Sequence, residues 1–270
     1  MPELPEVETT RLGLLPALQH QLLQQVVVRN PRLRWPVPGD LGSRLSGQTL
    51  RQIARRGKYL LFDFGAATQI VHLGMSGSLR LTTASEPAAL HDHLDWLFCN
   101  GAVLRLRDPR RFGAVLWTSD VASHPLLAHL GPEPLTDDFD AAWLHAQCQR
   151  RNSAIKQVIM DGHVVVGVGN IYASESLFHA GIRPAMAARR LSRPACARLV
   201  EAIKRVLTAA IAAGGSSLRD YVGSQGDLGY FQLQTRVYDR AGLPCKVCAR
   251  PIRRIVQGQR ATFYCPQCQR

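Results

Sequence analysis

Two pairs of cysteines near the C-terminal end constrain the fold of this chain more than any other feature. Cys245 and Cys248 form one pair, Cys265 and Cys268 form the other, and 16 residues separate the two pairs. A Cys-x2-Cys turn directs two thiolates to one point, and two such turns complete a tetrahedral zinc site. Because the protein then supplies every ligand, no position is left for a substrate water. We therefore expect one structural Zn²⁺.

Two other interpretations of these cysteines are a pair of disulfides and four unrelated thiols. The chain begins with acids and prolines instead of a secretory signal, which favours a reducing, cytoplasmic compartment over disulfides. The regular spacing argues against unrelated thiols. The other cysteines, Cys99, Cys148 and Cys196, have no partner at ligand spacing, and we expect them to be core residues.

The charge of the chain indicates a polyanionic partner. Lys and Arg number 33 against 20 Asp and Glu, which gives a net charge of +13, and residues 236–270 hold eight basic residues and one acid. A membrane is disfavoured, since no apolar run approaches the roughly 20 residues that cross a bilayer. Between Pro251 and Tyr264 an expected hairpin carries Arg253, Arg254 and Arg260, which suits contact with phosphate.

The hydrophobic pattern changes along the chain from strand-like to helical. A leading helix is expected from Pro5 to about Gln24, and 270 residues correspond to about two domains. Short β-like runs then predict a β-sandwich or open barrel, and the segments after a turn-rich Gly-Pro-Glu-Pro predict helices. The expected strands are Val26–Arg29, Tyr59–Phe64, Gln69–Leu73, Leu79–Leu81, Leu94–Phe98, Val103–Leu106 and Ala114–Trp117, and the expected helices are Phe139–Arg151, Ala154–Met160, Ile171–Ala180 and Arg193–Ala213.

These patterns predict an α+β protein in three parts. An N-terminal β-sandwich domain with a leading helix is expected over residues 1–130, and a helical domain over residues 131–230. The four-cysteine zinc finger with its β-hairpin is expected over residues 231–270. This last part is too small to bury a core without a staple such as a metal ion.

The N-terminus offers a possible nucleophile. Met1 precedes Pro2, a context in which the initiator methionine is normally removed, leaving a secondary amine. An α-amino group titrates near about 7.7–8.0 in a model peptide, and the adjacent helix start disfavours its protonated form. Many proteins begin Met-Pro, so this feature alone favours an ordinary flexible terminus.

Nine short motifs occur in order along the chain. They are PELPEVE at 2–8, RRGKYL at 55–60, HLGMSGSLR at 72–80, HDH at 91–93, DPRRFG at 108–113, LGPEPL at 130–135, AIK at 154–156, GVGNIYASE at 167–175 and QRATFYC at 259–265. In these motifs, and in the paired cysteines, the chain resembles the formamidopyrimidine-DNA glycosylase family over its whole length.

The resemblance implies a bifunctional DNA glycosylase and AP lyase of base excision repair. Its substrates would be oxidised purines, 8-oxoguanine and formamidopyrimidines, in duplex DNA. Pro2 would attack C1′ of the damaged nucleotide, displace the base and form a Schiff base, after which β- and δ-elimination remove the sugar. Glu3 would act as acid and base. Lys58 and Arg260 would complete the catalytic site by holding phosphates beside the lesion.

The resemblance also implies which residues bind and deform the DNA. His91 and Asn170 would grip phosphates together with Lys58 and Arg260. Asn170 would belong to a helix–two-turn–helix, and Lys156 would lie near the site as a further, secondary DNA-binding residue.

A base drawn out of the duplex leaves a hole that must be filled. Met75 would occupy that space, Phe112 would intercalate, and Arg110 would bond the orphaned cytosine. The Arg-x-Phe spacing would place both side chains on one side of an extended segment. The segment Ser216–Tyr230 matches a loop that closes over the extruded base, and Glu6 and Glu175 are expected to be structural.

Two alternatives stay open at this point. One is a sister enzyme acting on oxidised pyrimidines, and the other is a non-catalytic, zinc-dependent DNA-binding protein. In either case the chain is expected to be a monomer, in the bacterial cytoplasm and associated with the nucleoid.

Overall fold

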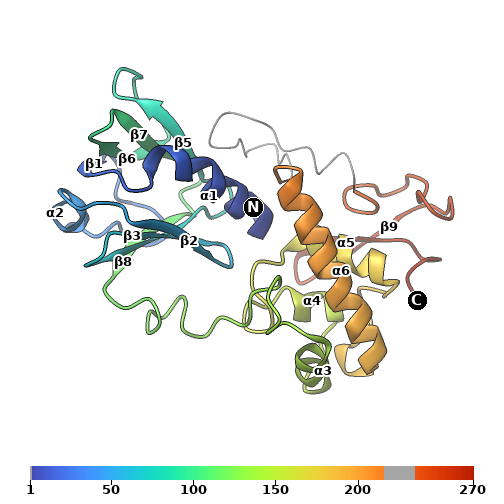
Figure 1. Cartoon of the computed structure of the whole chain (residues 1–270). Coiled ribbons are helices and arrows are strands. Elements are labelled where there is room, and N and C mark those ends of the chain that lie inside the picture. Colours follow the sequence, from blue (N-terminus) through green and yellow to red (C-terminus); the bar gives the residue numbers. More distant parts are fainter. Residues whose placement is uncertain (1, 216–234) are drawn as a thin grey trace. The chain divides into compact units, whose positions relative to one another are not determined.

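The computed structural model describes residues 2–215 and 235–270, which form two compact units. Among the described residues, the first unit comprises 2–128 and 213–215, and the second comprises 129–212 and 235–270. In Figure 1 the first unit carries the sheets and the second carries helices and a hairpin. The loop expected over Ser216–Tyr230 lies outside the described residues.

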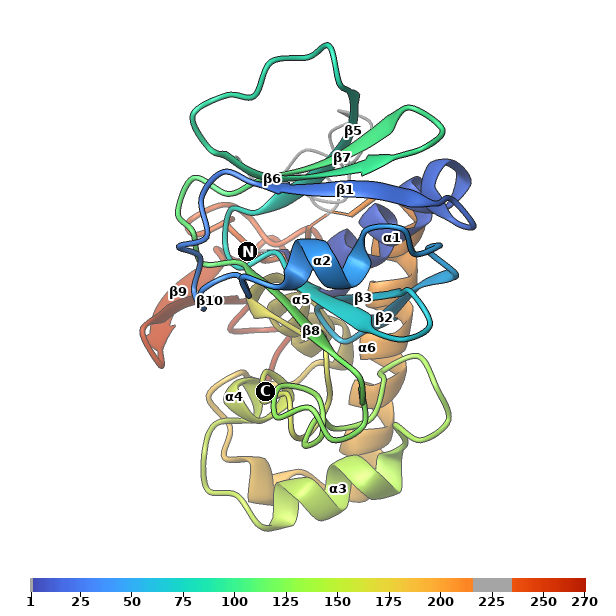
Figure 2. The same cartoon turned by 90° about the vertical axis from the view of Figure 1, so that its left-hand side faces the viewer.

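The first unit is a β-sandwich of two antiparallel four-stranded sheets. One sheet has the order β1-β6-β7-β5 and the other β2-β3-β4-β8, and Figure 2 shows the two as separate layers. The strands are β1 (Leu23–Val28), β2 (Gln52–Arg56), β3 (Tyr59–Asp63), β4 (Thr68–His72), β5 (Ser78–Thr83), β6 (Asp92–Phe98), β7 (Ala102–Arg107) and β8 (Ala114–Thr118).

Both sheets contribute to one hydrophobic core. Trp96 and Leu94 of β6 face this core from one sheet, and Leu60 and Phe62 of β3 face it from the other. Helix α1 (Leu4–Leu18) contacts β2 and β3, and the short helix α2 (Leu41–Leu45) contacts β1. The start of α1 is therefore fixed against a rigid sheet.

The end of the leading helix and strand β2 differ from the sequence-based expectations, and the short helix α2 was not expected either. The leading helix ends at Leu18 instead of continuing to about Gln24, because His20 takes the left-handed conformation (φ 65°) and β1 begins at Leu23. Strand β2 was not expected, since its sequence Gln-Ile-Ala-Arg-Arg is mostly polar. It is an edge strand with one buried side chain, Ile53, so it needs little hydrophobic sequence.

The second unit is helical. Its elements are α3 (Ala141–Gln149), α4 (Ile155–Ile159), α5 (Asn170–Ala180), the 3₁₀ turn η1 (Ala188–Arg190) and α6 (Arg193–Ala212). Asp140 caps α3 by accepting a hydrogen bond from the Trp143 amide at 2.7 Å. The long helix α6 buries one stripe against α3 and α5, formed by Cys196, Leu199, Val200, Ile203, Val206, Leu207 and Ala210.

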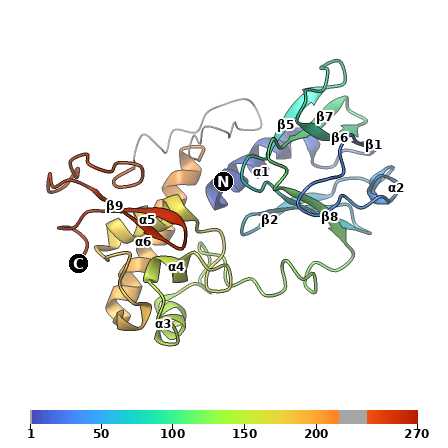
Figure 3. The ribbon, with the colours of Figure 1, turned by 180° about the vertical axis from the view of Figure 1, so that it is seen from behind.

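The second unit ends in a two-stranded hairpin, β9 (Arg253–Gln257) and β10 (Arg260–Tyr264). Strand β10 contacts α5, and Figure 3 shows the hairpin beside that helix. A small cluster of buried residues, which includes Phe178 of α5 and Phe263 of β10, lies beneath it. The expected α+β class, with β-sheets, a helical region and a C-terminal hairpin bearing four cysteines, is confirmed.

In the described part of the chain, no helix combines the length and the apolar content that crossing a membrane requires.

Candidate active site and metal centre

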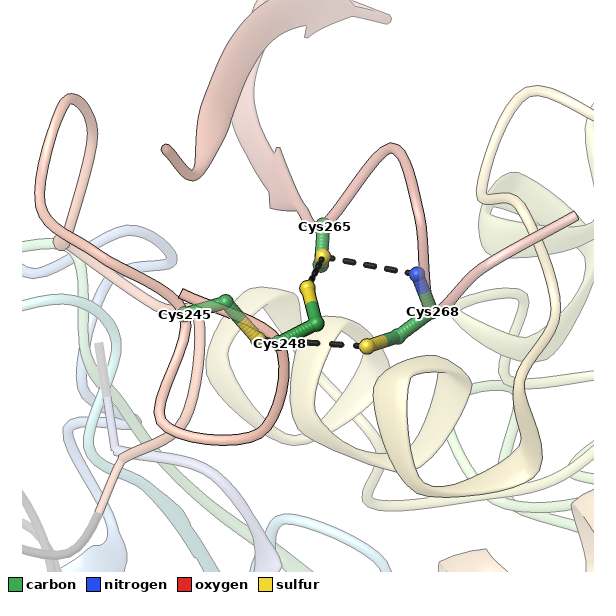
Figure 4. Close-up of side chains that lie close together, drawn as sticks. All are labelled: Cys245, Cys248, Cys265 and Cys268. Carbon is green, nitrogen blue, oxygen red and sulfur yellow. Dashed lines mark hydrogen bonds between the residues drawn. The ribbon is translucent and has the colours of Figure 1, made fainter. Parts of the chain in front are cut away.

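The four paired cysteines converge on one point. All four sulfur atoms lie within 4.8 Å of one another. The Cys245 and Cys268 sulfurs are 3.9 Å apart, and those of Cys248 and Cys265 are 3.4 Å apart (Figure 4). Four sulfurs bound to zinc at about 2.3 Å would be about 3.8 Å apart in a tetrahedron, so the cluster fits one Zn²⁺.

The donor set indicates a structural ion. Four thiolates close the coordination shell, which leaves no site for water or substrate. Amides of Val247 and Cys268 donate to the Cys245 and Cys265 sulfurs, at 3.5 and 3.4 Å, so the thiolate charge is partly balanced by the turns themselves. The zinc therefore holds the end of the chain together.

Arg260 occupies an exposed position next to the hairpin turn. Gly258 and Gln259 both have positive φ, 52° and 62°, which is the conformation that two-residue hairpin turns favour. Arg260 is the first residue of β10 and pairs with Gln257. Arg260 also lines a hollow of about 190 Å³ that it shares with Lys156, Gln157, Met160, Gln257 and Gly258.

Lys156 is a buried cation at the junction of three elements. Its side chain is 2 % exposed. Its Nζ donates to Asn170 Oδ1 at 2.6 Å, Thr262 Oγ1 at 2.7 Å and the Ala261 carbonyl at 3.2 Å. Lys156 belongs to α4, Asn170 begins α5, and the other two lie on β10, so one ammonium group joins all three elements. The resemblance placed Lys156 only near the site, without this network.

Asn170 stands where a glycine-rich turn becomes a helix. Gly167 has φ 82° and Gly169 is the N-cap of α5, as expected for a turn that opens a helix. The Asn170 Nδ2 donates to the Ala261 carbonyl at 3.0 Å, which uses one of its two hydrogens. Its amide is therefore held in one orientation by Lys156 and β10.

Glu175 anchors the segment that leads into the zinc finger. Its carboxylate accepts three backbone N–H bonds, from Arg236 at 2.8 Å, Val237 at 3.0 Å and Tyr238 at 2.8 Å. Burial raises the pKa of Glu175, and the three amide donors oppose this shift. These bonds support the structural role that was expected for Glu175. The three amide donors lie about 60 residues further along the chain, so no pattern in the sequence indicates them.

Pro2 and Glu3 are buried at the first turn of α1. Glu3 is 2 % exposed and is the N-cap of the helix. The Glu6 carboxylate accepts the Glu3 backbone N–H at 2.8 Å, which fixes the backbone directly after Pro2. Glu6 is fully buried and acts here as a structural acid.

Lys58 lies in the tight turn between β2 and β3, next to a group of basic side chains. Together with Arg34, it contributes to a positive field at His72. Burial and these two charges lower the pKa of His72 to about 4. The Gly74 amide donates to His72 Nδ1 at 3.1 Å, so the neutral ring carries its proton on Nε2.

Met75, Arg110 and Phe112 are brought together on two adjacent loops of the first unit. Met75 is 41 % and Phe112 44 % exposed, and the Arg110 guanidinium lies 4.8 Å from the centre of the Phe112 ring. The segment is a turn with Arg111 at φ 56°, not the extended segment that was expected. The left-handed residue still places Arg110 and Phe112 on one side.

His91 is connected to this second loop, because its carbonyl accepts the Asp108 amide N–H at 3.0 Å. The predicted residues thus fall into two groups. Pro2, Glu3, Lys58, Met75, His91, Arg110 and Phe112 belong to the first unit, and Lys156, Asn170, Arg260 and the four cysteines to the second.

Three family models match consecutive parts of the chain. Residues 1–115 match the formamidopyrimidine-DNA glycosylase N-terminal domain, residues 130–222 match the formamidopyrimidine-DNA glycosylase H2TH domain, and residues 242–270 match the zinc finger found in FPG and IleRS. The third match, together with the four-sulfur cluster, supports one structural zinc ion.

Complete proteins match over the full length as well. A formamidopyrimidine-DNA glycosylase of Thiobacillus denitrificans is 75 % identical over 270 residues, which is 100 % of both chains. The Lactococcus lactis Fpg in complex with abasic-site DNA has a TM-score of 0.92 and 34 % identity, covering 99 % of each chain. MutM in complex with DNA containing carbocyclic 8-oxo-G has a TM-score of 0.91 and 34 % identity, again over 99 % of each chain.

Removal of the metal is expected to unfold the zinc finger. The purified protein should contain one zinc per chain, and Cys265→Ser should lose it together with the hydrogen-exchange protection of β9 and β10, because the small cluster beneath the hairpin cannot hold it alone. Zinc is measured by atomic emission and protection by mass spectrometry. Cys148 and Cys196 are buried as expected, but Cys99 is exposed, so its expected core position is wrong. Cys99→Ser therefore serves as the control and should keep both the zinc and the protection. Full protection in a zinc-free Cys265→Ser protein would contradict this role.

Lys156→Met is expected to destabilise the protein by about 1–3 kcal/mol, because it leaves buried oxygen acceptors without their donor. Chemical denaturation measures the change. Lys204→Met is the matched control, since Lys204 bonds one carbonyl, of Thr136, at the surface and should lose less than about 0.5 kcal/mol. Equal effects of the two substitutions would show that the buried network contributes no special stability.

The pKa of His72 predicts an acid-sensitive stability. Between pH 6.5 and about 4 the unfolded chain binds a proton at this ring that the folded protein does not, so its contribution is complete above pH 6.5 and is lost as the pH falls towards 4. The ring keeps some contact with solvent, and the loss is at most about 3 kcal/mol. His72→Gln should flatten the unfolding free energy over this range. Parallel pH profiles for the two proteins would contradict the assignment.

Proposed function

Because the chain belongs to the formamidopyrimidine-DNA glycosylase family of DNA-repair enzymes, we propose that it excises oxidised purines and then cleaves the abasic site through an N-terminal proline. The observation that carries the proposal is the buried Pro2-Glu3 pair at the first turn of α1. Membership of the family supports the glycosylase activity, and cleavage of the abasic site by a lyase step is the additional part of the proposal.

The chemistry requires the free ring nitrogen of Pro2. After Met1 is removed, the nitrogen lone pair attacks C1′ of the extruded nucleotide, and the C1′–N9 bond breaks as the base leaves. Opening of the sugar ring gives an iminium ion, with Glu3 donating a proton to the ring oxygen. Loss of a C2′ proton then expels the 3′ phosphate, and a second elimination expels the 5′ phosphate.

Basic and amide groups on both units supply the DNA contacts. Lys58 and His91 of the first unit and Asn170 and Arg260 of the second are proposed to bind phosphates flanking the lesion. The fixed orientation of the Asn170 amide and the hollow beside Arg260 support this role. Lys156 then acts by holding Asn170 in place.

The exposed group of Met75, Arg110 and Phe112 is proposed to enter the duplex. Met75 and Phe112 are each more than two-fifths exposed, and exposure of apolar side chains to water is unfavourable. Both are suited to fill the space that an extruded base leaves in the stack. The Arg110 guanidinium beside them can bond the orphaned base. The solved relative bound to DNA with carbocyclic 8-oxo-G supports 8-oxoguanine as a substrate, and membership of the formamidopyrimidine-DNA glycosylase family supports formamidopyrimidines.

We also infer a monomeric, cytoplasmic enzyme that works at the nucleoid. The proposed division is a catalytic β-sandwich domain over residues 1–130, a helix–two-turn–helix domain with a lesion-capping loop over 131–230, and a zinc finger over 231–270. The net charge of +13 supports association with DNA.

Borohydride reduction tests the proposal directly. Protein whose mature N-terminus has been verified by mass spectrometry is incubated with an 8-oxoguanine:cytosine duplex and sodium borohydride. A covalent adduct is expected on Pro2, because the iminium ion is reduced to a stable amine. Pro2→Gly should give a weaker adduct through its primary amine, and protein that keeps Met1 should give none.

Two outcomes would point to the alternatives. Faster trapping on a dihydrouracil duplex than on 8-oxoguanine would identify a sister enzyme for oxidised pyrimidines. Binding to both duplexes without any adduct would identify a DNA-binding protein without lyase chemistry.

A further inference from the structure

Asp108 is a buried carboxylate between the two loops that carry the exposed group of Met75, Arg110 and Phe112. It is 0 % exposed, although it lies directly before the turn that bears Arg110. Neither the motif analysis nor the proposed chemistry gives it a role. A charged group in such a position is stable only when its oxygens are bonded.

Both carboxylate oxygens of Asp108 are bonded, and each bond leads to a different part of the loops. Oδ1 accepts the hydroxyl of Ser76, the residue after Met75, at 2.7 Å. Oδ2 accepts the backbone N–H of Gly113, the residue after Phe112, at 2.7 Å. Ser76 Oγ in turn accepts the Arg110 N–H at 3.2 Å. The carboxylate thus joins Ser76 to Gly113, and Ser76 connects it to the backbone of Arg110.

The backbones of the two loops also interlock. Gly74 has φ 62°, and a Cβ on this residue would lie 2.3 Å from the Phe112 carbonyl carbon. A Cβ on Gly113 would lie 2.9 Å from both Asp108 Oδ2 and the His72 carbonyl oxygen. Glycine is therefore required at both positions for this close approach.

Asp108 is itself held by the sheet beneath the loops. Its N–H donates to the His91 carbonyl at 3.0 Å, and its carbonyl contacts His93 Nε2 at 2.9 Å. Its carbonyl also accepts the Arg111 N–H at 3.1 Å. The left-handed turn and both loops are consequently tied to β6 through one residue.

We infer that Asp108, acting through Ser76, is a positioning residue that fixes Met75, Arg110 and Phe112 as one rigid wedge before DNA is bound. The inference rests on the proposed function of these three side chains. It adds that their geometry is set by a buried carboxylate beneath them. A wedge whose loop backbones are ordered in advance loses less conformational entropy when it enters the duplex.

The inference predicts a selective defect. An intact base pair must be unstacked and unpaired, which needs the wedge, whereas an abasic nucleotide has no base to displace. Loosening the wedge should therefore slow excision of 8-oxoguanine opposite cytosine and have little effect on cleavage of a pre-formed abasic site. General destabilisation of the enzyme would lower both rates together.

Ser76→Ala is the primary test, because it removes both hydrogen bonds of the hydroxyl without creating a large cavity. Single-turnover excision of 8-oxoguanine opposite cytosine should fall roughly tenfold or more, as expected when reacting groups are misplaced. Abasic-site cleavage should change less than about twofold on the same reasoning. Asp108→Asn should show the same pattern, with a larger defect, because the amide cannot accept both bonds.

A fluorescent 2-aminopurine beside the lesion reports the unstacking step. Its stopped-flow rise should be slower in Ser76→Ala by the same factor as excision. Ser43→Ala is the matched control: its hydroxyl bonds a backbone carbonyl, of Asp40, in the same unit but away from the loops, and both activities should be retained.

The outcomes separate this inference from the proposed function. Wild-type protein inactive on both substrates would overturn the proposed function. Active wild-type protein with both rates unchanged in Ser76→Ala, or with both reduced equally, would overturn the role of the Ser76–Asp108 contact.

Discussion

Four thiolates around one metal ion hold the C-terminal hairpin in place. The contacts that the second unit is proposed to make with DNA depend on this metal site. The cluster under the hairpin is small, and Arg260 lies on the hairpin with its side chain in solvent. Zinc fixes the strands, β10 presents Ala261 and Thr262 to Lys156, and Lys156 orients Asn170. A structural metal ion can thus determine the positions of Asn170 and Arg260, the two residues of this unit that are proposed to bind phosphates.

The same arrangement occurs in the first unit without a metal. There the buried charge is Asp108, and the groups that it orders are the exposed Met75, Arg110 and Phe112. In both units a buried ion with several hydrogen bonds lies beneath solvent-exposed side chains. A buried charge adds little net stability, but it fixes the positions of its hydrogen-bond partners. Each bond that is not made costs the full desolvation penalty of the group. A protein that deforms DNA needs such fixed side-chain positions, because part of the binding free energy offsets the cost of the deformation.

The sequence predicted most of the fold and the four zinc cysteines, and it gave no sign of side-chain contacts between residues far apart in the chain. Cysteine spacing predicts the zinc site because the turn geometry is local. The polar strand β2 lacks a pattern of its own and forms by pairing with β3. Lys156 and Thr262 are 106 residues apart, and Ser76 and Asp108 are 32 apart, so no periodicity reveals either contact. The leading helix ends earlier than predicted because His20 has a left-handed backbone conformation, which the identity of this residue does not predict.

The N-terminal proline places a further demand on the fold. A nucleophile at a chain end is free to fray, because it has a neighbour on one side only. Here the Glu6 carboxylate binds the Glu3 amide and α1 packs on β2 and β3, so the residue after the proposed nucleophile is the N-cap of a packed helix. Both carboxylates of this turn take part in the capping box of α1: Glu6, with no solvent exposure, accepts the Glu3 N–H, and the Glu3 side chain accepts the Glu6 N–H. Glu3 is also the proposed acid, next in sequence to Pro2. The proposed mechanism accounts for the acids in Pro-Glu-Leu-Pro-Glu-Val-Glu, because it needs an ordered helix start and a proton donor within a few residues of one amine.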